Sequence, residues 1–146
     1  MKKTMRVLCA SLIVSLVLVI PAQAEVTVEP RESIFFSSYV TYLYKTSSTS
    51  FQIWFDVDSN AVILDELGTS IIELYRSPDG QSWTKVKTYL KEDYPQMIDL
   101  DSFSYVNYVP YDSAWAGYYY TARVTFYARD SRGFGEREFY TDIVRM

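Results

Sequence analysis

Gly-Tyr-Tyr-Tyr-Thr-Ala-Arg-Val-Thr-Phe-Tyr-Ala-Arg-Asp-Ser-Arg-Gly-Phe-Gly-Glu-Arg-Glu-Phe-Tyr, residues 117–140, indicates the fold more clearly than any other stretch of the chain. Its first half alternates between two faces. One face carries Tyr118, Tyr120, Ala122, Val124, Phe126 and Ala128, and the other carries Tyr119, Thr121, Arg123, Thr125, Tyr127 and Arg129. A period of two with many aromatic and β-branched residues is typical of a β-strand with one buried and one solvated face.

A turn follows this strand at Asp130-Ser131-Arg132-Gly133, where Gly133 can adopt a positive φ. Residues 134–145 are then expected to return antiparallel as the last strand. The two strands form a hairpin, and the face that begins with Tyr120 is predicted to be core.

The first 24 residues have the organisation of a secretory signal peptide. Lys2, Lys3 and Arg6 form a charged start, residues 7–20 are apolar, and Ala22-Gln23-Ala24 is a small-x-small cleavage site. The apolar run is short for a bilayer span, which needs about 20 residues. We therefore predict cleavage after Ala24, secretion to the extracellular space, and no membrane association of the mature chain.

The remainder is expected to be one domain. Residues 25–36, interrupted by Pro30, are predicted to be a flexible leader, and residues 37–146 a single β-sandwich that can bury a core without disulfides. A monomer is expected.

The composition of the mature chain excludes several function classes. Three of the 14 basic residues lie in the signal peptide, which leaves 11 basic against 18 acidic residues and a net charge of −7. The chain has no histidine, and its only cysteine, Cys9, leaves with the signal peptide. Imidazole and thiolate catalysis, disulfides and zinc sites of the His/Cys kind are therefore not expected, nor is a cofactor. Nucleic-acid binding is not expected either, because the chain lacks a basic stretch.

Other strands can be located by alternation and by turn residues. They are predicted at residues 37–45, 51–57, 70–75, 82–90 and 104–109. Ser77-Pro78-Asp79-Gly80 is the strongest turn signal, and residues 91–103 are expected to be a loop that crosses between sheets. With the hairpin, about seven strands and no amphipathic helix predict an all-β fold, a two-sheet antiparallel sandwich.

An acidic run near the second predicted strand matches the beginning of the helix-loop-helix calcium-binding pattern. Asp56-Val57-Asp58-Ser59-Asn60 places oxygen ligands at alternate positions, but Ala61 stands where glycine is needed and Leu67 where a bidentate glutamate is needed. A polar loop between strands is the favoured interpretation. A looser calcium site, drawn from Asp65, Glu66, Asp99 or Asp101, stays open.

The hairpin resembles the penultimate strand region of fibronectin type III and related immunoglobulin-like domains. The residues that carry the resemblance are Gly117, Tyr120, Val124 and Ala128, followed by Asp130 and Gly133, and residues 71–86 resemble the third and fourth strands of such domains. The resemblance implies that Tyr120 acts as a tyrosine corner, in which the hydroxyl bonds to nearby backbone.

The whole chain also resembles a family of small secreted bacterial proteins that carry a domain of unknown function. The shared features are the Ser-x-Asp-Gly-x-x-Trp turn at residues 77–83 and the Gly-Tyr-x-Tyr start at residues 117–120. This resemblance implies location and fold, and it implies no activity.

A secreted binding or accessory module is the favoured function. Aromatic residues make up 17% of the chain, and none of them lies in the signal peptide. This number of aromatic residues is larger than one hydrophobic core needs. The candidate binding face consists of Tyr119, Arg123, Tyr127, Arg129 and Trp54, with Tyr42, Tyr44 and Trp115 as possible neighbours, and its partner would be a protein or a glycan. Alternatively, these rings lie flat against neighbouring strands, and Trp54 is a partly covered sheet residue.

Two other function classes stay open. A carboxylate-based glycan-active enzyme would need two acids across a cleft, with Asp58, Glu66, Asp99 and Asp101 as candidates. A structural, self-associating protein is the third possibility.

Overall fold

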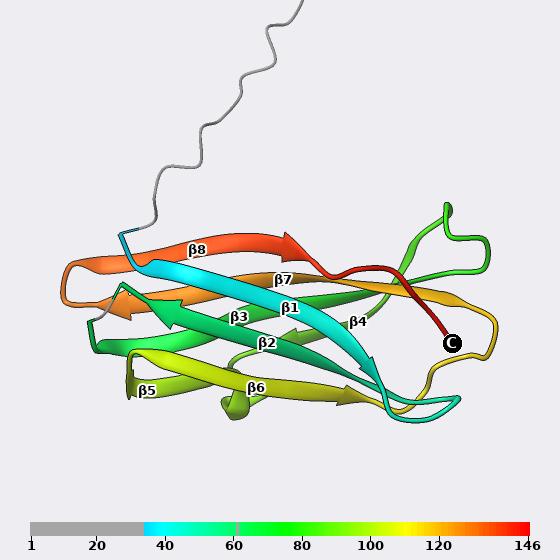
Figure 1. Cartoon of the computed structure of the whole chain (residues 1–146), viewed down its shortest axis with the longest axis horizontal. Helices are drawn as coiled ribbons and strands as arrows, with labels where there is room; N and C mark the ends of the chain where they lie inside the picture. The colour runs from blue at the N-terminus through cyan, green and yellow to red at the C-terminus, as the bar shows by residue number, and fades with distance from the viewer. Residues whose placement is uncertain (1–33, 61) are drawn as a thin grey trace, which may run out of the picture.

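The structure, a computed structural model, describes residues 34–60 and 62–146, so the predicted signal peptide and most of the predicted leader lie outside the described residues. This part of the chain forms nine strands and one short 3-10 helix (Figure 1). The strands are β1 (Phe36–Lys45), β2 (Phe51–Ser59), β3 (Leu64–Ser77), β4 (Thr84–Leu90), β5 (Ile98–Ser102), β6 (Ser104–Tyr111), β7 (Tyr119–Asp130), β8 (Gly133–Tyr140) and β9 (Val144–Arg145), and the helix is η1 (Pro95–Met97).

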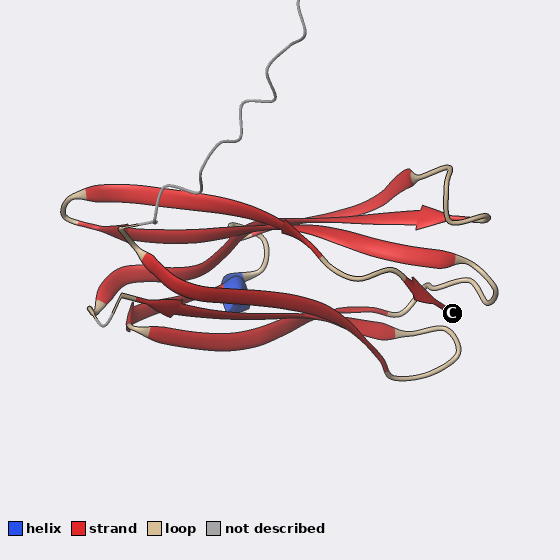
Figure 2. Cartoon of the chain, turned by 45° about the horizontal axis from the view of Figure 1, so that its top comes forward, coloured by secondary structure: helices blue, strands red, loops and turns tan. Residues whose placement is uncertain are grey.

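The strands form two antiparallel sheets that pack face to face (Figure 2). The three-stranded sheet has the order β1-β2-β6. The six-stranded sheet has the order β4-β3-β7-β8, with β5 paired to one end of β3 and β9 paired to the start of β7. The prediction of an all-β, two-sheet antiparallel sandwich is confirmed.

The predicted strand boundaries agree with the structure where turn residues mark the strand ends, and they agree less well elsewhere. The turns after β3 and after β7 form as expected, with φ of 76° at Gly80 and 131° at Gly133. The prediction of a loop at residues 91–103 is wrong, because that segment contains η1 and β5. The last strand ends at Tyr140 rather than 145, and the short β9 follows it.

Two further boundaries differ from the prediction. Strand β3 begins at Leu64, six positions before the predicted start, and a register shift between Thr69 and Ile71 divides its alternation into two halves. The run from Asp56 to Ser59 is part of β2 rather than a polar loop. In β2 the polar residues alternate with buried ones, so the acids lie on the outer face of a strand.

The core lies between the sheets and is built from the predicted faces. Tyr120, Ala122, Val124, Phe126 and Ala128 of β7 are fully buried, and so are Ile53, Phe55 and Val57 of β2. Phe35 and Phe36 also belong to the core, although the sequence places them at the end of the leader. The domain therefore begins before residue 37.

Tyr120 makes a hydrogen bond to nearby backbone, as the resemblance to fibronectin type III domains implies. Its ring packs 5.1 Å from Phe51 and 6.0 Å from Tyr111, centroid to centroid, and its hydroxyl oxygen accepts a 2.8 Å hydrogen bond from the amide of Trp115. One side chain thus joins the two sheets and fixes the segment that enters β7.

Candidate functional site

The predicted binding residues lie on two opposite surfaces. Tyr119, Arg123, Tyr127 and Arg129 are on the outer face of the six-stranded sheet, where β7 runs between β3 and β8. Trp54 is on the outer face of the three-stranded sheet, as its alternation with Phe51, Ile53 and Phe55 predicts. The structure therefore does not bring the five residues together.

Arg123 is held in an ion-pair cluster, defined here as the charge cluster of Glu73, Lys85, Arg123 and Glu138. Strand register places Arg123 directly opposite Glu73, and both its Nε, at 2.7 Å, and its Nη2 donate to Glu73 Oε2. Lys85 Nζ donates to Glu73 Oε1 at 2.9 Å, and Glu138 lies 3.6 Å from Arg123 Nη1. The charge of Arg123 is thus balanced within the sheet.

These partners change the acidity of Glu73. The hydrogen bond from Lys85, with those from Arg123 and from the hydroxyl of Tyr75, lowers the pKa of the Glu73 carboxyl to about 2, although burial opposes the shift. Since the folded pKa is below that of an unfolded glutamate, the carboxylate stabilises the fold above about pH 4.3. That stabilisation is lost as the pH falls through the pKa of Glu73 in the folded protein.

We expect Glu73→Gln to lower the free energy of unfolding by about 1 kcal/mol at neutral pH, a modest figure because Lys85 is half exposed. The loss should shrink as the pH falls towards the folded pKa, because the wild-type carboxyl is then protonated as well. Urea denaturation at neutral and acidic pH measures both values. Glu92→Gln, at an exposed position, is the control, and a pH-independent deficit at Glu73 would contradict this account.

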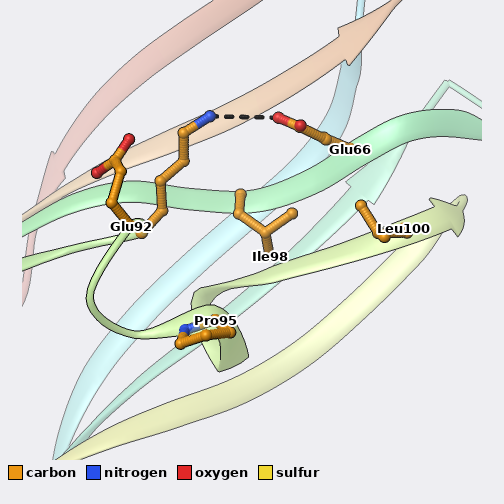
Figure 3. Close-up of a pocket in the computed structure, with 6 residues that line it drawn as sticks. Glu66, Glu92, Pro95, Ile98 and Leu100 are labelled. Carbon is orange, nitrogen blue, oxygen red and sulfur yellow. Dashed lines mark hydrogen bonds and ion pairs between the residues drawn. The ribbon is translucent and has the colours of Figure 1, made fainter.

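Arg129 and Tyr127 are also engaged at the other end of the sheet. Arg129 Nη2 lies 2.7 Å from Glu66 Oε1, and Lys91 Nζ lies 3.2 Å from Glu66 Oε2 and 3.8 Å from the centre of the Tyr127 ring. Glu66, Ile98 and Leu100 line a hollow of about 330 Å³. Figure 3 shows these three side chains beside one another. The expectation that Tyr127 is solvated is wrong: only 8% of it is exposed, because Lys91 and Phe134 cover the ring.

The surroundings of Trp54 are different, because aromatic rings meet there on a solvated sheet. Strand register sets Trp54 opposite Tyr42 of β1 on one side and Tyr108 of β6 on the other. The Tyr42 ring is parallel to Trp54 with centroids 6.2 Å apart, and the Tyr108 centroid is 4.8 Å away. Trp54 Nε1 donates to Gln52 Oε1 at 2.9 Å, which holds the indole in place. We call Tyr42, Trp54 and Tyr108 the aromatic row.

Apolar and acidic side chains border the aromatic row. Val40 and Val106 flank Asp56 in the next cross-strand row and are 53% and 50% exposed. Burial and the nearby charge of Asp58 raise the pKa of Asp56, whereas hydrogen bonds from Ser104 and Ser38 lower that of Asp58. The outward-facing positions of β1, β2 and β6 thus carry two carboxylates and no lysine or arginine.

Tyr108, Val40 and Val106 were not predicted from the sequence to belong to this surface. Their alternation places them on the outer face of a strand, but only the β2–β6 register sets them beside Trp54. The aromatic content of residues 104–111 was the available signal.

The acids considered for metal binding or catalysis are distributed over both sheets. Asp58 is in the three-stranded sheet, Asp99 and Asp101 are in β5, and Glu66 is paired with Lys91 and Arg129. Within residues 34–60 and 62–146, no group of three or more His, Cys, Asp or Glu residues could hold a metal ion. The same residues include no helix long and apolar enough to cross a membrane.

Comparison with known proteins finds no matching family model, no matching curated protein and no matching solved structure.

Proposed function

We propose that the protein is a secreted, non-enzymatic binding module that docks a cationic segment of a partner protein on the outer face of its three-stranded sheet. The observation that carries the proposal is the aromatic row, which spans all three strands and is bordered by exposed valines and by two carboxylates. Contiguous exposed apolar surface rimmed by polar groups is typical of interaction sites.

The charge of this face supports the choice of a cationic partner. Asp56 and Asp58 are not paired with a basic side chain of the same sheet face, and lysine or arginine can also bind over tryptophan and tyrosine rings. A second copy of the chain is a poor occupant, because the Asp56 and Asp58 carboxylates of both copies would approach each other. By contrast, Arg123 and Arg129 of the six-stranded sheet already have carboxylate partners.

We also propose that the sandwich is of the fibronectin type III or immunoglobulin-like kind. The sheet orders β1-β2-β6 and β4-β3-β7-β8 support this relation, and so does the hydrogen bond between Tyr120 and the Trp115 amide. Membership of the family of small secreted bacterial proteins, extracellular location and a monomeric state stay predictions.

We expect a peptide of lysine and leucine residues to bind the protein, and Trp54→Ala to weaken that binding about tenfold, the effect of removing a central aromatic contact. Trp115→Ala removes an exposed tryptophan from the loop between β6 and β7 and should leave the affinity unchanged. Isothermal titration calorimetry measures each dissociation constant, with the glutamate–leucine version of the peptide as the comparison.

A charge-matched pair of variants separates the site from the general acidity of the protein. Asp56→Asn/Asp58→Asn should weaken binding several-fold and reduce its salt dependence, whereas Asp93→Asn/Asp112→Asn makes the same change in net charge at exposed positions elsewhere. Equal effects of the two double variants, or equal affinities of Trp54→Ala and Trp115→Ala, would contradict the proposal.

A further inference from the structure

The outer face of the six-stranded sheet contains a second hollow, away from the aromatic row. It has a volume of about 450 Å³, within the range of small-ligand sites. Four strands or their ends contribute to its lining, which consists of Tyr75, Trp83, Thr121, Tyr140, Thr141 and Ile143. We call these six residues the sheet hollow. Figure 1 shows the turn after β3 and the C-terminus at one end of the sandwich, and Trp83 and Ile143 of the hollow belong to the segments that follow this turn and precede the C-terminus.

The walls of the sheet hollow are aromatic and its floor carries hydroxyl groups. The walls are Trp83, which directly precedes β4, and Tyr140, which ends β8 on the far side of β7, while Tyr75 belongs to β3. Between them, strand register sets Tyr75 directly opposite Thr121. A ligand in the hollow would therefore contact rings at its sides and hydroxyl oxygens beneath.

The hydrogen-bond directions at the floor restrict the chemistry of the ligand. The Tyr75 hydroxyl donates its proton to Glu73 Oε2 at 3.1 Å, and the Thr121 hydroxyl donates to the carbonyl of Thr141 at 3.0 Å. Thr141 Oγ1 in turn accepts from the amide of Ala122 at 2.9 Å. Since both floor hydroxyls have committed their protons, Tyr75 and Thr121 can only accept. One lone pair of Thr121 accepts from the Thr141 hydroxyl at 3.3 Å, and the lone pairs that remain favour a ligand that donates.

The sheet hollow offers no charged partner to a ligand. Its six lining residues are uncharged, and the nearby Glu73 carboxylate is already paired with Lys85 and Arg123. A neutral ligand that combines an apolar face for ring contacts with several hydroxyl donors meets both conditions. Pyranose sugars have this chemistry.

We propose that the sheet hollow is a binding site for a neutral saccharide, stacked on Trp83 and Tyr140 and hydrogen-bonded to the hydroxyl oxygens of Tyr75 and Thr121. This site is independent of the aromatic row, which takes a protein partner. The two proposals can therefore fail separately, because they depend on different tryptophans on opposite faces.

The test uses the fluorescence of Trp83 in the mature chain. In the variant Trp54→Phe/Trp115→Phe, Trp83 is the only remaining tryptophan. Neutral hexasaccharides of β-1,4-linked glucose, β-1,4-linked N-acetylglucosamine and α-1,4-linked glucose are titrated, with a sulfated hexasaccharide as the charged comparison. We expect at least one neutral sugar to shift the emission saturably and the sulfated sugar to leave it unchanged.

Affinities of single variants then assign the contacts. Trp83→Ala should lower the affinity for the neutral sugar about tenfold. Tyr75→Phe keeps the ring and removes the accepting oxygen, and it should lower the affinity about threefold to tenfold. Trp54→Ala should bind the sugar like the wild type and show weaker binding of the cationic peptide only. Calorimetric melting confirms that each variant is folded. The proposal is overturned if no neutral sugar binds, if only the sulfated sugar binds, or if both Trp83→Ala and Tyr75→Phe retain wild-type affinity.

Discussion

Replacing Gly68 with alanine is expected to lower the free energy of unfolding by about 4 kcal/mol or more, which is a large part of the stability of a small domain. A Cβ at this position would lie 2.0 Å from the carbonyl oxygen of Met97 and 3.0 Å from the Cα of Ile98. Both obstacles are backbone, so no side-chain rotation relieves the clash. Gly68 also has φ of +155°, which a residue with a Cβ rarely adopts.

Gly133→Ala separates the two causes. Gly133 has φ of +131°, but nothing lies within 4 Å of the position that a Cβ would take, so only the unfavourable backbone conformation of alanine costs stability, about 1–2 kcal/mol. Urea denaturation of both variants measures the difference. Equal losses would show that β5 and η1 can move away from β3, and that the close approach at Gly68 is not a fixed feature of the fold.

Tyr120 is expected to give the second large effect. Tyr120→Ala removes a fully buried ring that contacts Phe51 and Tyr111 across the two sheets, and we expect a loss of about 3–5 kcal/mol. Tyr120→Phe keeps the ring and removes only the acceptor for the Trp115 amide, at a cost of about 1–2 kcal/mol.

Hydrogen exchange localises the role of the Tyr120 hydroxyl. In Tyr120→Phe, the amide of Trp115 should exchange faster than in the wild type, while amides in the centre of β3 keep their protection. Tyr44→Phe, at an exposed position of β1, is the control and should change neither stability nor exchange. An unchanged Trp115 amide in Tyr120→Phe would mean that its hydrogen bond to the tyrosine does not hold this segment.

The features that could be predicted from sequence are those set by local rules. The alternation that begins at Tyr120 identified a buried face because β7 lies in the centre of its sheet with one side on the core. The turns ending at Gly80 and Gly133 depend on residues adjacent in sequence. The orientation of Trp54 away from the core followed from the same period of two.

The features that were missed depend on contacts between distant residues. Strand β5 exists because residues 98–102 pair with the first half of β3, and that pairing needs the space that Gly68 leaves. Tyr127 has a solvent-facing position in its strand, yet Lys91, 36 residues earlier in the chain, covers its ring. Alternation assigns a side chain to a face, and it does not show what neighbouring strands place over that face.

The partners of the predicted arginines show the same limit. Arg123 and Arg129 were correctly placed on the outer face, but their carboxylate partners Glu73 and Glu66 come from β3 and are found only through strand register. Register likewise brings Tyr108 to Trp54. Candidate sites on a sheet therefore require the pairing of strands, which one sequence does not determine.

The aromatic row has an optical consequence. The ring centroids of Tyr108 and Tyr42 lie 4.8 and 6.2 Å from that of Trp54, so excitation absorbed by either tyrosine passes to Trp54, and the packing of the three rings contributes to the near-ultraviolet circular dichroism band of the protein. The band depends on ring geometry that a docked partner would alter. The three-stranded sheet thus carries its own unlabelled spectroscopic reporter of occupancy.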